Sequence, residues 1–156
     1  MSKSYLNAGL LLLRVGSGIA LVSHGYPKLF GGEGKQAHPL LNKVYGKNFQ
    51  PAVERSGPAA FARGLEQMEV PMPELAAYAS GVAEFGGGLA LALGFLTRLA
   101  APMVLFNMLT AIRKAHWANG FSGQGGFEMP SLFAIIAATI ALTGPGRYSL
   151  DALMRR

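Results

Sequence analysis

The sequence contains no cysteine among its 156 residues. Disulfides, thiolate metal ligands, iron–sulfur clusters and cysteine nucleophiles are therefore excluded. Charged side chains are also scarce, at 14% of the residues, whereas a soluble domain carries about 25%. The hydrophobic share of 51% leaves too few charges to cover an ordinary soluble globule, and it excludes a disordered chain.

Several motifs of well-known enzyme classes are missing as well. The glycines at 86–88 precede no phosphate-loop lysine, and no HExxH pair occurs. Ser23 and Ser122 lack the spacing and the aspartate partner of an acyl-transfer triad. Two histidines and Glu128 lie on three separate segments and form no metal motif. We therefore predict no metal site and assign no catalytic residue.

The chain is basic, but its positive charge forms no run. The net charge is +6 and the pI is about 9.9. Such a balance is typical of chains that bind nucleic acid or an anionic membrane surface. The sequence has no aromatic stripe with interleaved arginines on which bases would stack. We therefore predict a lipid bilayer, and no nucleic acid, as the partner of this chain.

What the sequence has is a series of apolar segments, at residues 5–30, 73–95, 98–117 and 128–143. A membrane-spanning helix needs about 20 mostly apolar residues, a length that the first three segments reach. The fourth spans only with tilt or local thinning of the bilayer. We predict an all-α fold: a four-transmembrane-helix bundle that forms a single integral membrane domain. Arg14 interrupts the apolar core that a signal peptide needs, so the first helix is expected to be retained.

A long loop over residues 31–72 connects the first two segments and is rich in glycine, proline and charge. Inside it, the sequence predicts a short helix over Pro58–Met68, capped by Ser56 or Gly57. This helix suits a membrane interface or a lid on the bundle. Its apolar residues share one face: Phe61, Leu65 and Met68. The last apolar segment is expected to end at Gly144-Pro145-Gly146, a strong helix stop.

Three polar residues lie inside the predicted spans at similar depth. Counted from the side of the termini at about 1.5 Å per residue, Arg14, Glu84 and Asn107 lie about 12, 16 and 14 Å deep. Such residues are costly in hydrocarbon and usually pair or face a cavity. We predict an intramembrane polar layer with an Arg14–Glu84 ion pair. The layer serves either as a structural lock on helix register, or as the floor of a ligand cavity or a proton-conducting step.

A second polar group is predicted near the opposite membrane face, formed by His24, Lys28, Tyr78, Arg113, His116 and Glu128. We call this group the outer recess. Its positive charge and its aromatic residue suit an anion or a quinone-like head group. The alternative is that Lys28 only snorkels to the interface and that the two histidines are packed core residues. Haem is not expected as a cofactor, because bulky side chains flank His116.

Short motifs recur in a fixed order along the chain: residues 11–14 and 24–30 in the first segment, 84–88 and 93–98 in the second, Asn107, Glu128, and the closing stretch 142–151. In this order they resemble the DoxX family of small bacterial membrane proteins. The resemblance covers most of the chain except about residues 34–56, which look like an insertion. It implies a four-helix bundle of the cytoplasmic membrane. The family name is tied to a subunit similar to one of a thiosulfate:quinone oxidoreductase, and relatives are linked to redox and thiol-stress complexes.

Three functions follow from the residues and the resemblance. The first is the membrane subunit of a redox complex, with a polar cavity that binds a quinone or a small anion and with a soluble or membrane redox partner. The second is a small transporter or proton-coupled channel that uses the polar layer. The third is a scaffold that recruits a soluble enzyme through the 31–72 loop.

The expected location is the bacterial inner (cytoplasmic) membrane, with both termini in the cytoplasm. Basic residues on the side of the termini lie nearer the helix ends than those of the long loop, which favours this orientation. Small residues recur four apart, as in Gly88/Ala92 and Ala134/Ala138. We interpret these pairs as packing within one chain, with a homo-oligomer as the alternative.

Overall fold

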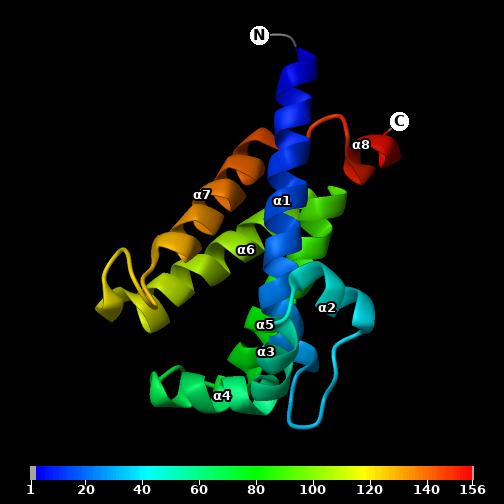
Figure 1. Cartoon of the computed structure of the whole chain (residues 1–156). Coiled ribbons are helices and arrows are strands. Elements are labelled where there is room, and N and C mark those ends of the chain that lie inside the picture. Colours follow the sequence, from blue (N-terminus) through cyan, green and yellow to red (C-terminus); the bar gives the residue numbers. More distant parts are fainter. Residues whose placement is uncertain (1–2, 156) are drawn as a thin grey trace. The chain divides into compact units, whose positions relative to one another are not determined.

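The computed structural model describes residues 3–155, and within that range the chain is helical and has no strand. Figure 1 shows the helices along the chain. Those that take the places of the predicted segments are α1 (Lys3–Phe30), α5 (Pro73–Leu93), α6 (Thr97–Ala111) and α7 (Glu128–Thr143). The predicted all-α fold class is confirmed.

These four helices differ in their capacity to cross a membrane. α1 and α5 are each long and apolar enough to do so, and α7 is apolar but shorter. α6 is α-helical for 15 residues, about 22 Å, whereas the hydrocarbon core of a bilayer is about 30 Å thick. The chain continues from α6 as a π-helix, η1 (Ile112–His116), and a 3-10 turn, η2 (Trp117–Asn119). Four complete spans therefore stay a prediction.

The 31–72 segment holds more helix than the sequence analysis predicted. The expected helix is present as α4 (Pro58–Gln67), with Gly57 at its N-cap and Pro58 in its first turn. Two helices of seven residues each precede it, α2 (Pro39–Tyr45) and α3 (Phe49–Arg55). Helices of two turns show too little periodicity to stand out in a sequence. Their stability comes from packing rather than from propensity.

The C-terminal end also differs from the prediction. α7 ends at Thr143, and Gly144 follows as its C-cap, as the glycine-rich stop predicts. Beyond it lies a further short helix, α8 (Leu150–Met154), which the sequence analysis did not predict. The Ser149 side chain caps α8 by accepting a hydrogen bond from the backbone N–H of Ala152.

The chain divides into two compact units. The terminal unit comprises the chain up to Ala20 together with the chain from Gly87 onward, and the central unit comprises Leu21–Gly86. α1 and α5 each contribute residues to both units.

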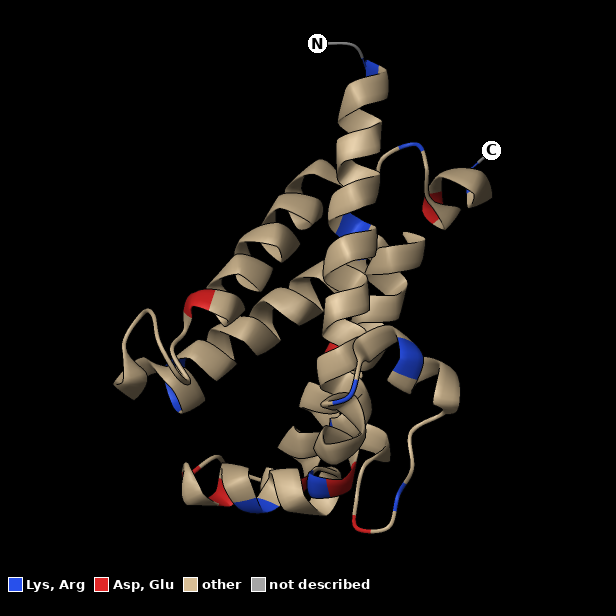
Figure 2. Cartoon of the chain, in the orientation of Figure 1, with Lys and Arg blue, Asp and Glu red and all other residues tan. Residues whose placement is uncertain are grey.

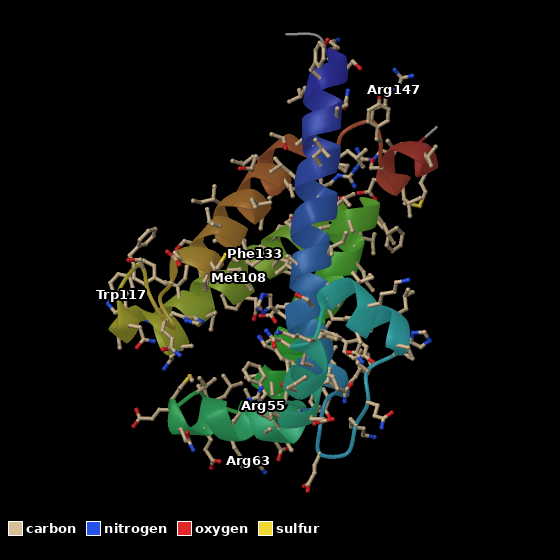
Figure 3. The ribbon with its side chains drawn as sticks, viewed as in Figure 1. Arg55, Arg63, Met108, Trp117, Phe133 and Arg147 are labelled. Atoms are coloured by element: carbon tan, nitrogen blue, oxygen red, sulfur yellow. The ribbon has the colours of Figure 1, made fainter. Side chains whose placement is uncertain are left out.

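Close helix packing holds the terminal unit together. A Cβ on Gly18 of α1 would lie 2.5 Å from the carbonyl oxygen of Gly88, so only glycine allows this approach of α1 to α5. α6 and α7 lie side by side, and Figure 3 shows Met108 and Phe133 on neighbouring stretches of the two helices. Figure 2 shows both helices almost free of charged residues between their ends. Gly88 thus takes part in packing within the chain, the use that the sequence analysis favoured for its small-residue pairs.

The central unit has its own small core. Phe49 and Val53 of α3 are buried, and Tyr26 of α1 packs against them. The backbone N–H of Gly32 donates to the carbonyl oxygen of Val53 at 2.9 Å, which fastens the end of α1 to α3. A Cβ on Gly31 would lie 2.5 Å from the same carbonyl oxygen. This core packs α3 against the C-terminal end of α1.

Candidate functional site

An ion pair joins α1 to α5 inside the central unit. Lys28 Nζ lies 2.6 Å from Glu84 Oε1, and the two side chains are 20% and 6% exposed. Lys28 Nζ also donates to Ser80 Oγ at 3.4 Å, one helical turn before Glu84. The pair is a short, charge-assisted hydrogen bond with little access to water. We call these three residues the Lys28 site.

Glycines bring the two helices close enough for this pair. A Cβ on Gly25 would lie 2.2 Å from the backbone nitrogen of Phe85 and 2.8 Å from the carbonyl carbon of Glu84. One on Gly81 would lie 2.6 Å from a methyl carbon of Leu29. Backbone therefore meets backbone within one turn of both charged residues. The spacing of α1 and α5 at the Lys28 site depends on glycine at position 25.

One aromatic ring contacts the lysine, and three more pack against one another in the same unit. The Phe61 ring of α4 lies 4.5 Å from Lys28 Nζ, a cation–π contact. Phe85, next to Glu84 in sequence, packs edge to face against Phe30 at 5.2 Å and lies 6.1 Å from Tyr26. We call these four rings the aromatic wall. The central unit thus combines an ammonium, a carboxylate and a hydroxyl with flat apolar surfaces.

The Lys28 site can serve two chemical tasks. An ammonium has three N–H donors, so it can hold Glu84 and still donate to an oxygen of a ligand. A carboxylate paired with such a donor can accept a proton from a ligand or return one. The aromatic wall supplies the apolar contact that a planar ring or a lipid-soluble molecule needs. The arrangement fits a ligand with a flat body and a polar oxygen.

A second buried cation lies in the terminal unit. Arg14 of α1 has an exposed fraction of 0%. Its Nη1 donates to the carbonyl oxygens of Leu91 and Ala92 at 3.2 and 3.4 Å, and its Nη2 donates to that of Tyr148. Gly94 makes room for it, because a Cβ there would lie 2.1 Å from Nη1. Arg14 ties α1 to the end of α5 and to the segment before α8.

Asp151 of α8 forms the other half of this connection. Its Oδ1 and Oδ2 accept hydrogen bonds from the backbone N–H groups of Leu96 and Thr97, each at 2.9 Å. Its own N–H donates to the carbonyl oxygen of Gly94 at 2.8 Å. Burial by itself would raise the pKa of Asp151, but the hydrogen bonds from Thr97 and Leu96 outweigh it and hold that pKa below its ordinary value. Asp151 therefore caps α6 as a carboxylate.

The structure describes other contacts for Arg14 and Glu84 than the pair that the sequence analysis predicted. Glu84 forms an ion pair with Lys28, which had been assigned to the outer recess, and Arg14 contacts main-chain carbonyls. Depth along a helix indicates which residues share a level, but it does not indicate which faces meet. The polar layer of Arg14, Glu84 and Asn107 and the Arg14–Glu84 pair within it therefore stay predictions.

The other members of the outer recess lie in both units. In the central unit, His24 and Tyr78 are exposed, and Tyr78 lines a groove between α4 and α5. In the terminal unit, Arg113 and Glu128 are exposed. His116 Nδ1 lies 2.8 Å from the carbonyl oxygen of Gly125, a contact within the loop that follows α6. The recess as a single cavity stays a prediction.

Some residues of these sites were missed by the sequence analysis. Ser80 lies four residues before Glu84, a spacing that places both on one helix face. Phe61 was expected on an apolar face, but not against a lysine. Asp151 is the one aspartate of the sequence, which marks it as unusual, yet nothing local shows what it caps. Within residues 3–155, no three His, Asp or Glu side chains are placed to hold a metal ion.

Comparison with known proteins decides the family. The family model described as DoxX matches residues 9–117, which is more than half of the chain. The chain belongs to the DoxX family. This DoxX protein is 37% identical over 84 residues to the inner membrane protein YqjF of Escherichia coli (strain K12). The match covers 47% of this chain and 57% of the relative. The chain thus spans little more than half the length of that relative.

The family match extends over α1 to η1 and the start of η2, and so it includes the Lys28 site and Arg14. α7 and the closing stretch at 142–151, which the sequence analysis regarded as the most specific motif, lie outside it. No solved structure matches this DoxX protein. The family and the inner membrane relative together confirm the expectation of a membrane protein.

Proposed function

We propose that this protein is the membrane component of a redox complex and that the Lys28 site binds the head group of a quinone. The observation that carries the proposal is the ion pair of Lys28 and Glu84, 2.6 Å apart and only 20% and 6% exposed, beside the aromatic wall. Ionisable residues within an apolar helix are expensive and usually mark a functional site. The electrons would come from a partner protein, for which the membrane component supplies the quinone site.

The chemistry of a quinone matches the groups present. Its carbonyl oxygens need hydrogen-bond donors, and Lys28 Nζ has N–H groups beyond the one directed at Glu84. Its ring needs flat apolar contacts, and the Phe61 ring beside Lys28 offers such a surface. A small inorganic anion would use the lysine but would gain nothing from the rings, so we favour the quinone of the two ligands.

The proposed topology is four spans with both termini in the cytoplasm. α1 and α5 meet the length and hydropathy of a span. α6 with its continuation to Asn119 measures about 34 Å at helical rise, which is sufficient for a bilayer. α7 would cross with local thinning. In this topology the Lys28 site lies towards the face opposite the termini.

The test is binding of a short-chain quinone to the purified protein in detergent, measured as a shift of the thermal unfolding temperature. We expect the parent protein to be stabilised and Lys28→Ala to lose at least tenfold in affinity. Lys43→Ala, which removes an exposed lysine from α2, should bind like the parent. Equal binding by both variants, or stabilisation by sulfur oxyanions but not by quinones, would contradict the proposal.

A further inference from the structure

The terminal unit contains a groove that no part of the proposed function uses. It has a volume of about 710 Å³ and lies where α8 and the segment before it approach α1 and α5. Its apolar lining comes from Leu11 of α1, Leu93 of α5, and Leu150 and Leu153 of α8. Its polar lining includes Arg147 and Tyr148. We call it the α8 groove.

The pattern of burial in α8 is the reverse of that of a helix on the surface of a soluble protein. Its charged residue, Asp151, is 8% exposed, whereas Leu153 and Met154 are 60% and 61% exposed. The reason is the cap described above, since Asp151 must reach the N–H groups of Leu96 and Thr97. The leucines of α8 are therefore held outward by a polar anchor. In a membrane protein, such an apolar surface is stable when acyl chains cover it.

The charge at the end of this groove is positive. Arg147 is exposed, and Figure 3 shows it on the connection between α7 and α8. Its backbone N–H donates to Asn7 Oδ1 at 2.8 Å, which holds this connection beside α1. The carboxylate of α8, Asp151, is occupied by the amides of α6 and does not face the groove opening as a free anion. An arginine thus lines the groove together with leucines of α1, α5 and α8.

We propose that the α8 groove binds an anionic phospholipid, with the phosphate on Arg147 and an acyl chain along Leu11, Leu93, Leu150 and Leu153. A basic side chain next to an apolar groove at the end of membrane helices matches the two parts of such a lipid. The guanidinium also matches the geometry of a phosphate. The groove lies in a different unit from the Lys28 site, so this inference is independent of quinone binding.

The experiment is native mass spectrometry of the detergent-solubilised full chain with equal amounts of phosphatidylglycerol and phosphatidylethanolamine. We expect one phosphatidylglycerol to be retained in preference. A single cation near an anionic lipid changes binding by about fivefold, so Arg147→Gln should lower the preference by that factor. Arg55→Gln, which removes an exposed arginine from α3, is the matched control and should keep the preference.

A second variant tests the acyl contact. Leu153→Ser changes an exposed side chain, so it should leave the unfolding temperature unchanged while it lowers retention of both lipids. Equal retention of the two lipids by the parent protein would overturn the proposal, as would equal loss in Arg147→Gln and Arg55→Gln. Displacement of the lipid by millimolar inorganic phosphate would show that a free anion is the ligand, and a dimer mass in place of bound lipid would show a second copy of the chain.

Discussion

The Lys28 side chain does not extend towards water as lysines near helix ends usually do. A lysine near the end of a membrane helix usually extends its stem towards the head groups. Here the stem turns towards α5, and Nζ contacts Glu84, Ser80 and the Phe61 ring. The lysine gives up most of its solvent contact for these three partners. The position of the Lys28 side chain therefore depends on the Glu84 carboxylate, and a substitution of Glu84 should displace Lys28 first.

Glu84→Gln should destabilise the protein by about 3 kcal/mol, because Lys28 would remain poorly solvated without its countercharge. We take the lower end of the range for buried pairs, since Lys28 keeps 20% of its exposure. Thermal unfolding in detergent measures the effect. The double variant Lys28→Met with Glu84→Met should recover much of the loss. A Glu84→Gln protein that unfolds like the parent would mean that the pair adds nothing to stability.

Gly25→Ala should lower stability by about 3 kcal/mol and also abolish ligand binding at the Lys28 site. The added Cβ would lie 2.2 Å from a backbone nitrogen of α5, and backbone cannot move aside as a side chain does. Gly16→Ala on the same helix is the control, because its Cβ would meet nothing within 4 Å. That change should be neutral or stabilising by up to about 1 kcal/mol. Similar behaviour of the two variants would show that the close approach of α1 to α5 at Gly25 does not limit the stability of the protein.

At the scale of elements, sequence and structure agree where a segment is long and uniform. The four apolar segments became α1, α5, α6 and α7 with ends within a few residues, apart from the π and 3-10 continuation of α6. α4 was predictable because Gly57-Pro58 is a strong start signal. α2, α3 and α8 were not, because each is two turns or less and shows too little periodicity to stand out in the sequence.

The candidate sites follow the same rule. Glu84, Lys28 and Arg14 could be singled out from the sequence, since charge inside an apolar run is conspicuous. Their partners could not. The pairing of Lys28 with Glu84 accompanies the close approach of α1 to α5 at Gly25, and the partners of Arg14 are carbonyl groups, which every residue has. Residue type indicates where a site lies, but the packing of the helices determines which groups form an ion pair or a hydrogen bond.

The cap that α8 places on α6 predicts a pH dependence. The lowered pKa of Asp151 means that its stabilisation is present above the unfolded value of about 3.9 and is lost as the pH falls through the folded pKa. Asp151→Asn should lower the free energy of unfolding by about 1 kcal/mol at pH 7. The difference in stability between variant and parent should vanish once the pH is below the folded pKa of Asp151. Unfolding measured between pH 7 and pH 2.5 checks this.

A direct readout is also available, because Asp151 is the one aspartate of the sequence. Selective carbon-13 labelling of aspartate gives one carboxyl resonance whose titration reports this group. Glu54→Gln, which changes an exposed carboxylate of α3, should keep the parent pH profile. A carboxyl resonance that titrates at or above the ordinary aspartate range would contradict the cap.

At the scale of the whole molecule, the absence of cysteine makes the topology testable without background labelling. Single cysteines at exposed positions Lys3, Arg98, Lys47 and Ser122 can each be treated with a membrane-impermeant maleimide in intact cells. We expect Lys47 and Ser122 to react from outside, and Lys3 and Arg98 to react only after the membrane is opened. Labelling of Lys3 and Arg98 from opposite sides would exclude the four-span arrangement.

Arg14 has a consequence for the order in which the protein is made. Its acceptors, the carbonyls of Leu91, Ala92 and Tyr148, follow it by 77, 78 and 134 positions. At about 5–20 residues per second, α1 leaves the ribosome roughly 7–27 s before the last of them exists. The Leu91 and Ala92 carbonyls exist after about 4–16 s, and until then the guanidinium has none of these three acceptors. The complete set of Arg14 hydrogen bonds therefore forms only after Tyr148 has been synthesised, so α1 reaches its final contacts late in the synthesis of the chain.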